Sequence, residues 1–168
     1  MNRRNSREKF GALILGILLL SAAGAGAQPG SRDLHLSANL VPKPELTPDQ
    51  VVQIQLNALR HNDARNRGIE VAFRFASPDN KLNTGPLPRF ISMMQQGPYS
   101  LMLDYENLAY HPLEVVENQA RQRVTLIGAG LVVDYEFYLS RQSAGSCSGC
   151  WLTDAVIARR ASGLQVQS

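Results

Sequence analysis

Residues 46–60 (LTPDQVVQIQLNALR) constrain the fold more than any other stretch of the chain. Thr47 and Gln50 are spaced as a capping box, and Pro48 stands at the first helical position, so they predict where a helix begins. At 100° per residue the apolar side chains cover a face wider than a single stripe: Val51, Val52, Ile54, Leu56, Ala58 and Leu59. A face this wide predicts a helix held in a concave partner, such as a curved sheet.

The net charge of +3 describes the N-terminus rather than the rest of the chain. Four of the 17 basic residues and one of the 14 acidic residues precede residue 28, which leaves 13 of each. A chain of 168 residues with 44% hydrophobic residues has room for one domain with an ordinary core. Residues 28–168 are neutral overall and lack a basic stripe interleaved with aromatic residues, so we expect no nucleic-acid partner.

Residues 1–27 have the pattern of a secretory signal peptide. A basic segment precedes the apolar run of residues 10–20, and Ala25-Gly26-Ala27 forms a cleavage site that would leave Gln28 as the new N-terminus. The apolar run is short for a bilayer span. We therefore predict a periplasmic or secreted bacterial protein with no stable membrane anchor after cleavage; the alternative is an uncleaved anchor.

The remaining chain divides into three predicted parts. Residues 28–45 contain three prolines and Gly30, and this composition predicts a flexible linker. Residues 46–160 form the predicted single domain. Residues 161–168 are expected to be a disordered tail.

The helical half of the domain contains one ambiguous segment. Residues 69–76 fit the alternation of a strand and also the spacing of a helix. Residues 77–80 and 83–85 each predict a turn. A second firm helix begins at Pro86 and is ended by Gly97-Pro98, with one apolar face formed by Leu87, Phe90, Ile91 and Met94.

Five later segments are rich in β-branched and aromatic residues: 105–110, 113–116, 119–127, 131–141 and 150–159. Their short connections predict antiparallel neighbours, and helices followed by strands predict an α+β domain with its helices on one face of the sheet. In residues 131–141, Val133, Tyr135, Phe137 and Leu139 share a face that we expect to be dry. Asp134, Glu136, Tyr138 and Ser140 share the opposite, wet face.

Cys147 and Cys150 are separated by two residues. In an oxidising compartment this spacing predicts a disulfide, although two alternatives remain: free thiols with Cys150 buried, and a redox-active pair. The three histidines, His35, His61 and His111, are scattered along the chain and supply no second ligand pair. We therefore expect neither a metal nor another cofactor.

Four blocks carry a family resemblance: residues 74–80, residues 84–87 with Arg89-Phe90, residues 139–142, and residues 149–154. In this order they resemble the family catalogued as domain of unknown function 4864, over residues 46–156. Members of that family look similar to the nuclear transport factor 2-like cone, in which helices pack into a strongly curved sheet and leave a pocket. The resemblance implies a helix at residues 69–76. Cys147 is not part of the family pattern.

The expected pocket has seven candidate ligand-binding residues: Arg74, Arg89, Asp104, Tyr105, Tyr135, Arg141 and Asp154. The arginines could grip a carboxylate ligand, or Arg141 or Arg74 could pair with Asp154 and tie a strand to the helices. Asp104 is the nearest candidate for a general base. A general base in such a pocket would need a carboxylate or histidine on the dry face, where desolvation shifts its pKa toward neutrality. The sequence places no such residue there, so we assign no catalytic residue.

Three functions follow as hypotheses, since a fold does not fix a function. The first is non-catalytic binding of a small apolar or carboxylate ligand, or of a protein partner. The second is a cofactor-free isomerase or dehydratase, and the third is a homodimer formed through the sheet. A buried Asp or His beside a Tyr in the pocket would favour the enzyme, whereas an apolar outer sheet face would favour the dimer.

Overall fold

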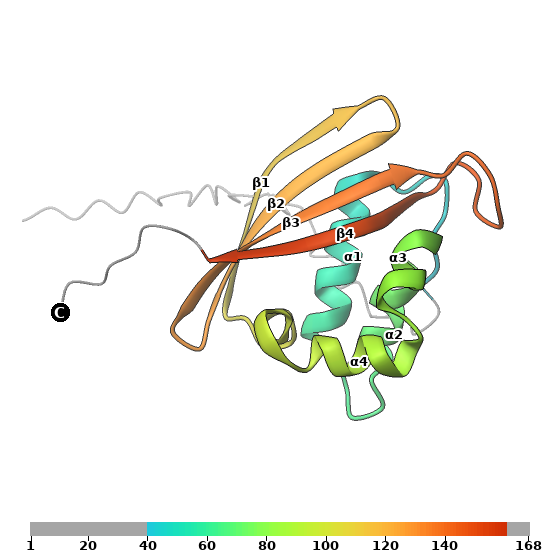
Figure 1. The fold of residues 1–168 in the computed structure, drawn as a ribbon. Helices are drawn as coiled ribbons and strands as arrows, with labels where there is room; N and C mark the ends of the chain where they lie inside the picture. The colour runs from blue at the N-terminus through green and yellow to red at the C-terminus, as the bar shows by residue number, and fades with distance from the viewer. Residues whose placement is uncertain (1–39, 161–168) are drawn as a thin grey trace, which may run out of the picture. The chain divides into compact units, whose positions relative to one another are not determined.

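The computed structural model describes residues 40–160, in which helices precede a single sheet (Figure 1). The helices are α1 (Pro48–Arg60), α2 (Arg67–Arg74), α3 (Pro78–Thr84), α4 (Leu87–Met94) and the 3-10 helix η1 (Gly97–Leu103). The strands are β1 (Asn107–Val116), β2 (Gln119–Gly128), β3 (Leu131–Arg141) and β4 (Trp151–Arg160). The predicted signal peptide, its cleavage site and the predicted tail lie outside the described residues.

The sheet has the strand order β1-β2-β3-β4, and each neighbouring pair is antiparallel. It is curved, and the helices lie on one of its faces (Figure 1). This arrangement confirms the predicted α+β class. None of the helices within residues 40–160 is long and apolar enough to cross a bilayer.

Helix α1 forms the centre of the core, as its sequence predicts. The N–H of Thr47 donates to Oε1 of Gln50 at 3.0 Å, and Pro48 occupies the first helical position. Val52 and Leu56 have no exposed surface, and Leu59 is buried as well. The helix packs on α2 and contacts β2, β4 and η1. Burying each of these aliphatic side chains contributes on the order of 1.5–3 kcal/mol.

The two faces of the sheet differ in chemistry. Val133, Tyr135, Phe137 and Leu139 of β3 are buried beneath the helices, which confirms the predicted dry face. The residues between them are half-buried on the other side of the sheet. On β2 the same alternation buries Val124 and Leu126 and exposes Arg121 and Arg123. The outer face of the sheet therefore carries charged side chains, together with the exposed apolar side chains of Val116, Ile127 and Ile157.

Residues 69–76 are mostly helical, in agreement with the resemblance, but α2 begins and ends two residues earlier than this range. After α2, Ala76 forms an isolated parallel bridge with Thr153. The two turns predicted in residues 77–85 are wrong, because this segment forms α3. Its cap explains the difference: Oγ of Ser77 accepts from the N–H of Asn80, and Pro78 starts the helix. No residue of α3 is buried, so no apolar period marks it.

Two further expectations are corrected at the start of the sheet. Gly97-Pro98 ends α4 but then begins η1, whose C-cap is Asp104, so the strand predicted from residue 105 begins only at Asn107. The predicted strands 105–110 and 113–116 are one strand, β1. The register shifts between Tyr110 and Leu113, so a bulge absorbs Pro112 without ending the strand. The sheet described here consequently has four strands, not five.

Candidate functional site

A cavity of about 80 Å³ lies between the helices and the end of the sheet formed by β3 and β4. Its apolar lining comes from Leu59, Ala72, Ala76, Phe90, Met93, Met94, Tyr99, Met102, Phe137 and Val156, and its polar lining comes from Gln55, Asn80, Thr84 and Thr153. Every helix of the described chain and both of these strands contribute to the wall. The volume exceeds the roughly 10–15 Å³ that one water molecule needs.

The polar lining is gathered around the side-chain amide of Gln55, which is buried. Its Nε2 donates to the carbonyl oxygen of Ala72 at 3.1 Å, and its Oε1 accepts from the hydroxyl of Thr153 at 2.7 Å. Nδ2 of Asn80 donates to the carbonyl oxygen of Thr153 at 2.9 Å, while the Thr84 hydroxyl donates to the carbonyl oxygen of Asn80. The cavity is thus apolar with one neutral hydrogen-bonding end.

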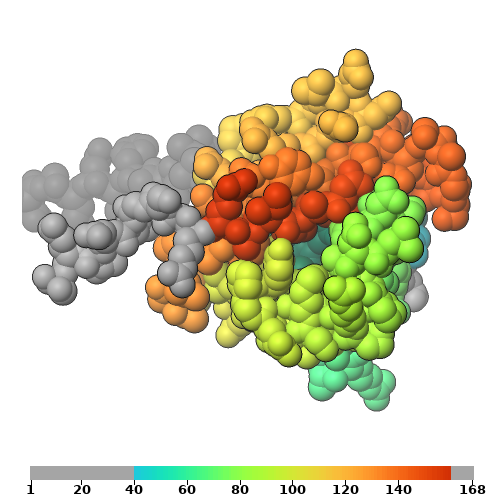
Figure 2. Space-filling model, viewed as in Figure 1, coloured from blue at the N-terminus to red at the C-terminus, as the bar shows by residue number. Residues whose placement is uncertain are grey.

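The mouth of the cavity lies along the free edge of β4. Two groups on that edge are already bonded to the helical layer. Thr153 exchanges backbone hydrogen bonds with residues 75–77, and the carbonyl oxygen of Val156 accepts from the hydroxyl of Tyr99 at 3.0 Å. Figure 2 shows a hollow between red β4 and the green helices, with the teal of α1 visible at its base. The half-buried residues of the lining, including Met93, Tyr99 and Val156, mark this opening.

Two of the seven predicted site residues lie together near α1. The carboxylate of Asp104 is 3.5 Å from the guanidinium of Arg60, which in turn lies over the ring of Tyr105. Asp104 is almost fully exposed, whereas Tyr105 is buried. Burial raises the pKa of the Tyr105 hydroxyl, and Arg60 opposes that rise. Neither residue lines the cavity.

Tyr135 is fully buried, and its hydroxyl donates to the carbonyl oxygen of Pro98. Burial, followed by the neighbouring Tyr99, raises its pKa well above that of a free phenol. The hydroxyl is therefore neutral, and its hydrogen bond to the backbone of Pro98 joins β3 to η1. Tyr135 does not line the cavity either.

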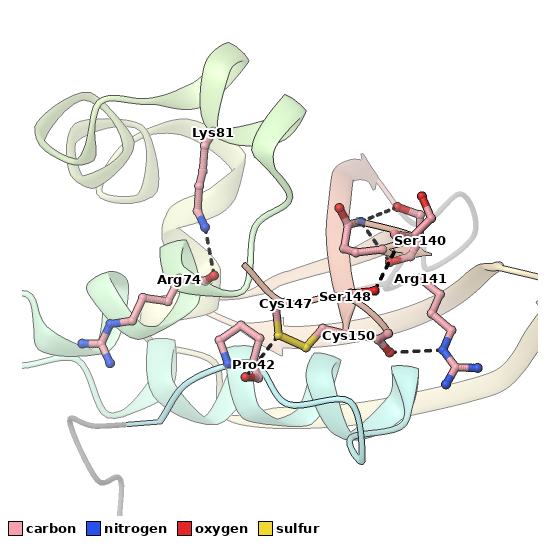
Figure 3. The surroundings of a disulfide bond; sticks show 11 residues. Pro42, Arg74, Lys81, Ser140, Arg141, Cys147, Ser148 and Cys150 are labelled. Atoms are coloured by element: carbon pink, nitrogen blue, oxygen red, sulfur yellow. Dashed lines mark hydrogen bonds between the residues drawn. A yellow bond between two sulfur atoms is a disulfide. The ribbon is translucent and has the colours of Figure 1, made fainter. Parts of the chain in front are cut away.

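The four charged residues of the family-like blocks are spread over the surface. Arg74 on α2 donates to the carbonyl oxygen of Leu40 and lies 3.3 Å from Glu70, while Arg89 is exposed on α4. Nε of Arg141 donates to the carbonyl oxygen of Gly149 at 3.1 Å (Figure 3). Asp154 accepts from the hydroxyl of Ser140. The structure does not bring the seven predicted residues to one site.

The predicted disulfide between Cys147 and Cys150 is present (Figure 3). Their Cα atoms are 5.5 Å apart, within the usual range for such a bond. Cys150 is fully buried and Cys147 is partly exposed. The carbonyl oxygen of Pro42 lies 3.5 Å from Sγ of Cys147, so the bridged loop packs on the segment that leads into α1. Within residues 40–160 no group of three His, Cys, Asp or Glu side chains could hold a metal ion.

Sequence reasoning missed the polar end of the cavity. Gln55 lies one helical turn before Leu59 and one turn after Val51, so its place on the apolar face of α1 was a readable signal. Thr153 gave no such signal because a threonine in a strand is ordinary on either face. Asn80 falls in a predicted turn, where amides are common.

The fold and this cavity define a small α+β protein with a pocket between its helices and its sheet. A scan against protein-family models matches residues 43–165 to the family described as "Domain of unknown function (DUF4864)". The chain belongs to this family. No curated protein and no solved structure matches the chain.

Proposed function

We propose that this protein is an exported small-ligand-binding protein, and that its ligand occupies the cavity between the helices and β4. The observation that carries the proposal is the hydrogen-bonded pair of Gln55 and Thr153 at the end of an otherwise apolar cavity. Pockets for small molecules are mostly apolar, with a few polar groups that fix the orientation of the ligand. This lining has both components.

The polar groups at that end retain unused hydrogen-bonding capacity toward the cavity. A side-chain amide carries two N–H donors and an oxygen with two lone pairs. Within residues 40–160, Gln55 uses one donor and one lone pair, and Asn80 also uses one donor. These groups are neutral, so they suit a ligand with a hydroxyl, carbonyl or amide group. A charged ligand would lose its hydration shell in the cavity and find no opposite charge there to compensate, so it would bind poorly.

Three methionines, Met93, Met94 and Met102, form part of the wall. Methionine side chains are unbranched and flexible, so they allow a cavity to adapt its shape to a ligand. A cavity of about 80 Å³ suits a small branched or cyclic apolar group, and rotation of these side chains enlarges it.

Binding is favoured over the enzyme and dimer hypotheses by the chemistry of two surfaces. The cavity lining described here contains no carboxylate, histidine, lysine or arginine that could exchange a proton with a substrate. The outer sheet face carries Arg121, Arg123 and Glu136 between its exposed apolar side chains, so it is not the continuous apolar surface that would favour the sheet-mediated dimer.

Export is supported by the disulfide, because such bonds persist in oxidising compartments and are rare in the bacterial cytosol. The signal-like pattern of residues 1–27 supports the same proposal. A measured mass of the mature protein that corresponds to a chain beginning at Gln28 would confirm the cleavage after Ala27. A mature protein that retains Met1 would overturn it.

The test of ligand binding is an NMR titration of the full chain with isobutanol and, separately, with isobutyrate. We expect isobutanol to shift the side-chain amide signals of Gln55 and Asn80, and isobutyrate to leave them unchanged. Ala76→Leu fills the cavity and should abolish the shifts, whereas Ala144→Leu, on an exposed loop, should not. Shifts that persist in Ala76→Leu, or an equal response to isobutyrate, would overturn the proposal.

A further inference from the structure

The outer face of the sheet contains a second cavity, of about 280 Å³, that is separate from the one beneath the helices. Its walls come from three strands: His111, Pro112 and Glu114 of β1, Arg121 and Arg123 of β2, and Glu136 of β3. Five of these six side chains are charged or titratable. The cavity is therefore a polar site, and nothing in the proposed function above uses it.

The bulge in β1 places His111 over this cavity. Tyr110 pairs with Val124 and Leu113 pairs with Gln122, so His111 and Pro112 together face Arg123. Two residues opposing one is the definition of a bulge, and bulges redirect the side chains that they carry. Here His111 is turned outward, where its Nε2 lies 2.8 Å from Oγ1 of Thr125.

The hydrogen bonds around His111 fix its tautomer. The hydroxyl of Thr125 donates to Asp134 at 2.6 Å, so its oxygen accepts from Nε2–H of His111. Nδ1 then accepts from Arg123, whose guanidinium nitrogen is 3.0 Å away. In this arrangement Nδ1 of His111 accepts from the guanidinium and holds it at the cavity wall without neutralising its charge.

The charges of this cavity are unequally satisfied. Arg121 forms three hydrogen bonds with Glu114, at 2.8, 2.9 and 3.2 Å, so these two charges compensate each other. Arg123 donates one hydrogen bond, to His111, and forms a long ion pair with the carboxylate of Asp134 at 4.0 Å. A guanidinium has five N–H donors. Within residues 40–160, most of the donors of Arg123 have no hydrogen-bond acceptor and are available to a ligand.

Glu136 lies directly opposite Arg123 in the register of β2 and β3. Side chains in such a pair are close enough to form an ion pair, yet in the described chain these two do not. Oε2 of Glu136 instead accepts from the hydroxyl of Tyr138 and from Nε of Arg159. Its Oε1 accepts no hydrogen bond within residues 40–160, and Glu136 is one of the residues that line the cavity. A cationic and an anionic group thus line one cavity without touching each other.

We propose that this outer cavity binds a small zwitterion of the α-amino-acid class, with the ligand carboxylate on Arg123 and the ligand ammonium on Oε1 of Glu136. A carboxylate matches the planar fork of a guanidinium in two parallel hydrogen bonds. An ammonium donates three hydrogen bonds and suits a carboxylate oxygen. Glu114 and Glu136 disfavour a phosphate, because each would repel a doubly charged anion.

The test compares three molecules of similar shape in NMR titrations: L-leucine, isocaproate and isopentylammonium. L-leucine is a zwitterion, whereas the other two carry only its carboxylate or only its ammonium. We expect L-leucine to shift the amide signals of β1, β2 and β3 around His111 and Arg123, with millimolar affinity or better. Each singly charged molecule should bind at least about tenfold more weakly, because it leaves one charged group of the site without its partner.

Two variants separate the site from the fold. Arg123→Gln and Glu136→Gln are neutral replacements of similar shape, and each should weaken L-leucine binding about 30-fold while the circular dichroism spectrum stays unchanged. Arg65→Gln, at an exposed position in the connection between α1 and α2, removes the same charge elsewhere and should have no effect. Equal binding of isocaproate, retained binding in Arg123→Gln, or the absence of shifts with every standard amino acid would each overturn the proposal.

Discussion

The hydroxyl of Thr153 on β4 donates a 2.7 Å hydrogen bond to the side-chain oxygen of Gln55 on α1, and both residues are buried. The nitrogen of the same amide donates to the carbonyl oxygen of Ala72 on α2. One side chain therefore joins two helices to the last strand. A buried network of this kind stabilises the fold only while each member keeps its partner.

Replacing Gln55 with leucine should lower the free energy of unfolding by about 1–3 kcal/mol, because Thr153 and the Ala72 carbonyl would lose their partners in a buried place. Urea unfolding at neutral pH measures the change. Gln53→Leu is the matched control: it makes the same replacement on the exposed side of α1 and should stay within about 0.5 kcal/mol of wild type. Equal losses in the two variants would show that the Gln55 network contributes nothing.

The same pair can be tested by a double-mutant cycle. Thr153→Val removes the hydroxyl with little change of volume, and the Gln55→Leu/Thr153→Val double variant removes both partners. We expect the double variant to be less destabilised than the sum of the single variants, by about 0.5–3 kcal/mol. Additive losses would mean that the two residues act independently.

Gly68 permits the close approach of α2 to α1. A Cβ atom at this position would lie 2.0 Å from the carbonyl oxygen of Ala58 and 2.9 Å from Cα of Asn62, and both of these atoms belong to the backbone. Gly68→Ala should therefore force the two helices apart and destabilise the protein by about 2–3 kcal/mol, despite the better helix propensity of alanine. Thermal unfolding measures this loss. Asn83→Ala, at an exposed position of α3, should leave the midpoint nearly unchanged.

The elements that sequence reasoning predicted correctly are those whose own side chains specify them. In α1, the Thr47 and Gln50 pair marks the first turn and the apolar period marks the buried face. In β3 the alternation around Tyr135 and Phe137 separates a wet face from a dry one. Such patterns record burial directly, because a residue on the wrong face would expose apolar surface or bury a charge.

The elements that it missed are set by contacts with distant parts of the chain. Helix α3 buries none of its own residues; Ser77 caps it locally, and Asn80 bonds to Thr153 on β4. The bulge at His111 and Pro112 is visible only once the pairing of β1 with β2 is known. The same reason hid the polar end of the inner cavity and the outer cavity, since each is assembled from residues of several elements.

Removing the disulfide should weaken the protein only modestly. Because the bond closes a loop of four residues, it restricts the unfolded chain little, and its loss should cost at most about 2 kcal/mol. A Cys147→Ser/Cys150→Ser variant should therefore remain folded with a slightly lower melting temperature. Reductant should lower the melting temperature of wild type by the same amount and should not affect the variant. A loss of the fold in the variant would show that the packing of this loop on Pro42 contributes more than the bond itself.

Asp63 lies in the connection between α1 and α2. We expect it to make the free energy of unfolding depend on pH under acidic conditions. Its carboxylate accepts from the backbone N–H groups of Arg67 and Arg65, at 3.1 and 3.0 Å, and from the side chain of Arg67. The backbone and side-chain hydrogen bonds from Arg67 lower its pKa below the ordinary value of 3.8. The folded protein therefore binds the proton less readily than the unfolded chain does.

It follows that the contribution of Asp63 to stability is fully present above the unfolded pKa and is lost as the pH falls through the lowered, folded pKa. Asp63→Asn should be less stable than wild type near neutral pH, and the two proteins should become equally stable once the pH is below the folded pKa. Urea unfolding over a series of pH values measures this convergence. Glu106→Gln, at an exposed carboxylate, should give a curve parallel to that of wild type. A constant difference between Asp63→Asn and wild type at every pH would mean that the ionised carboxylate is not what holds this connection.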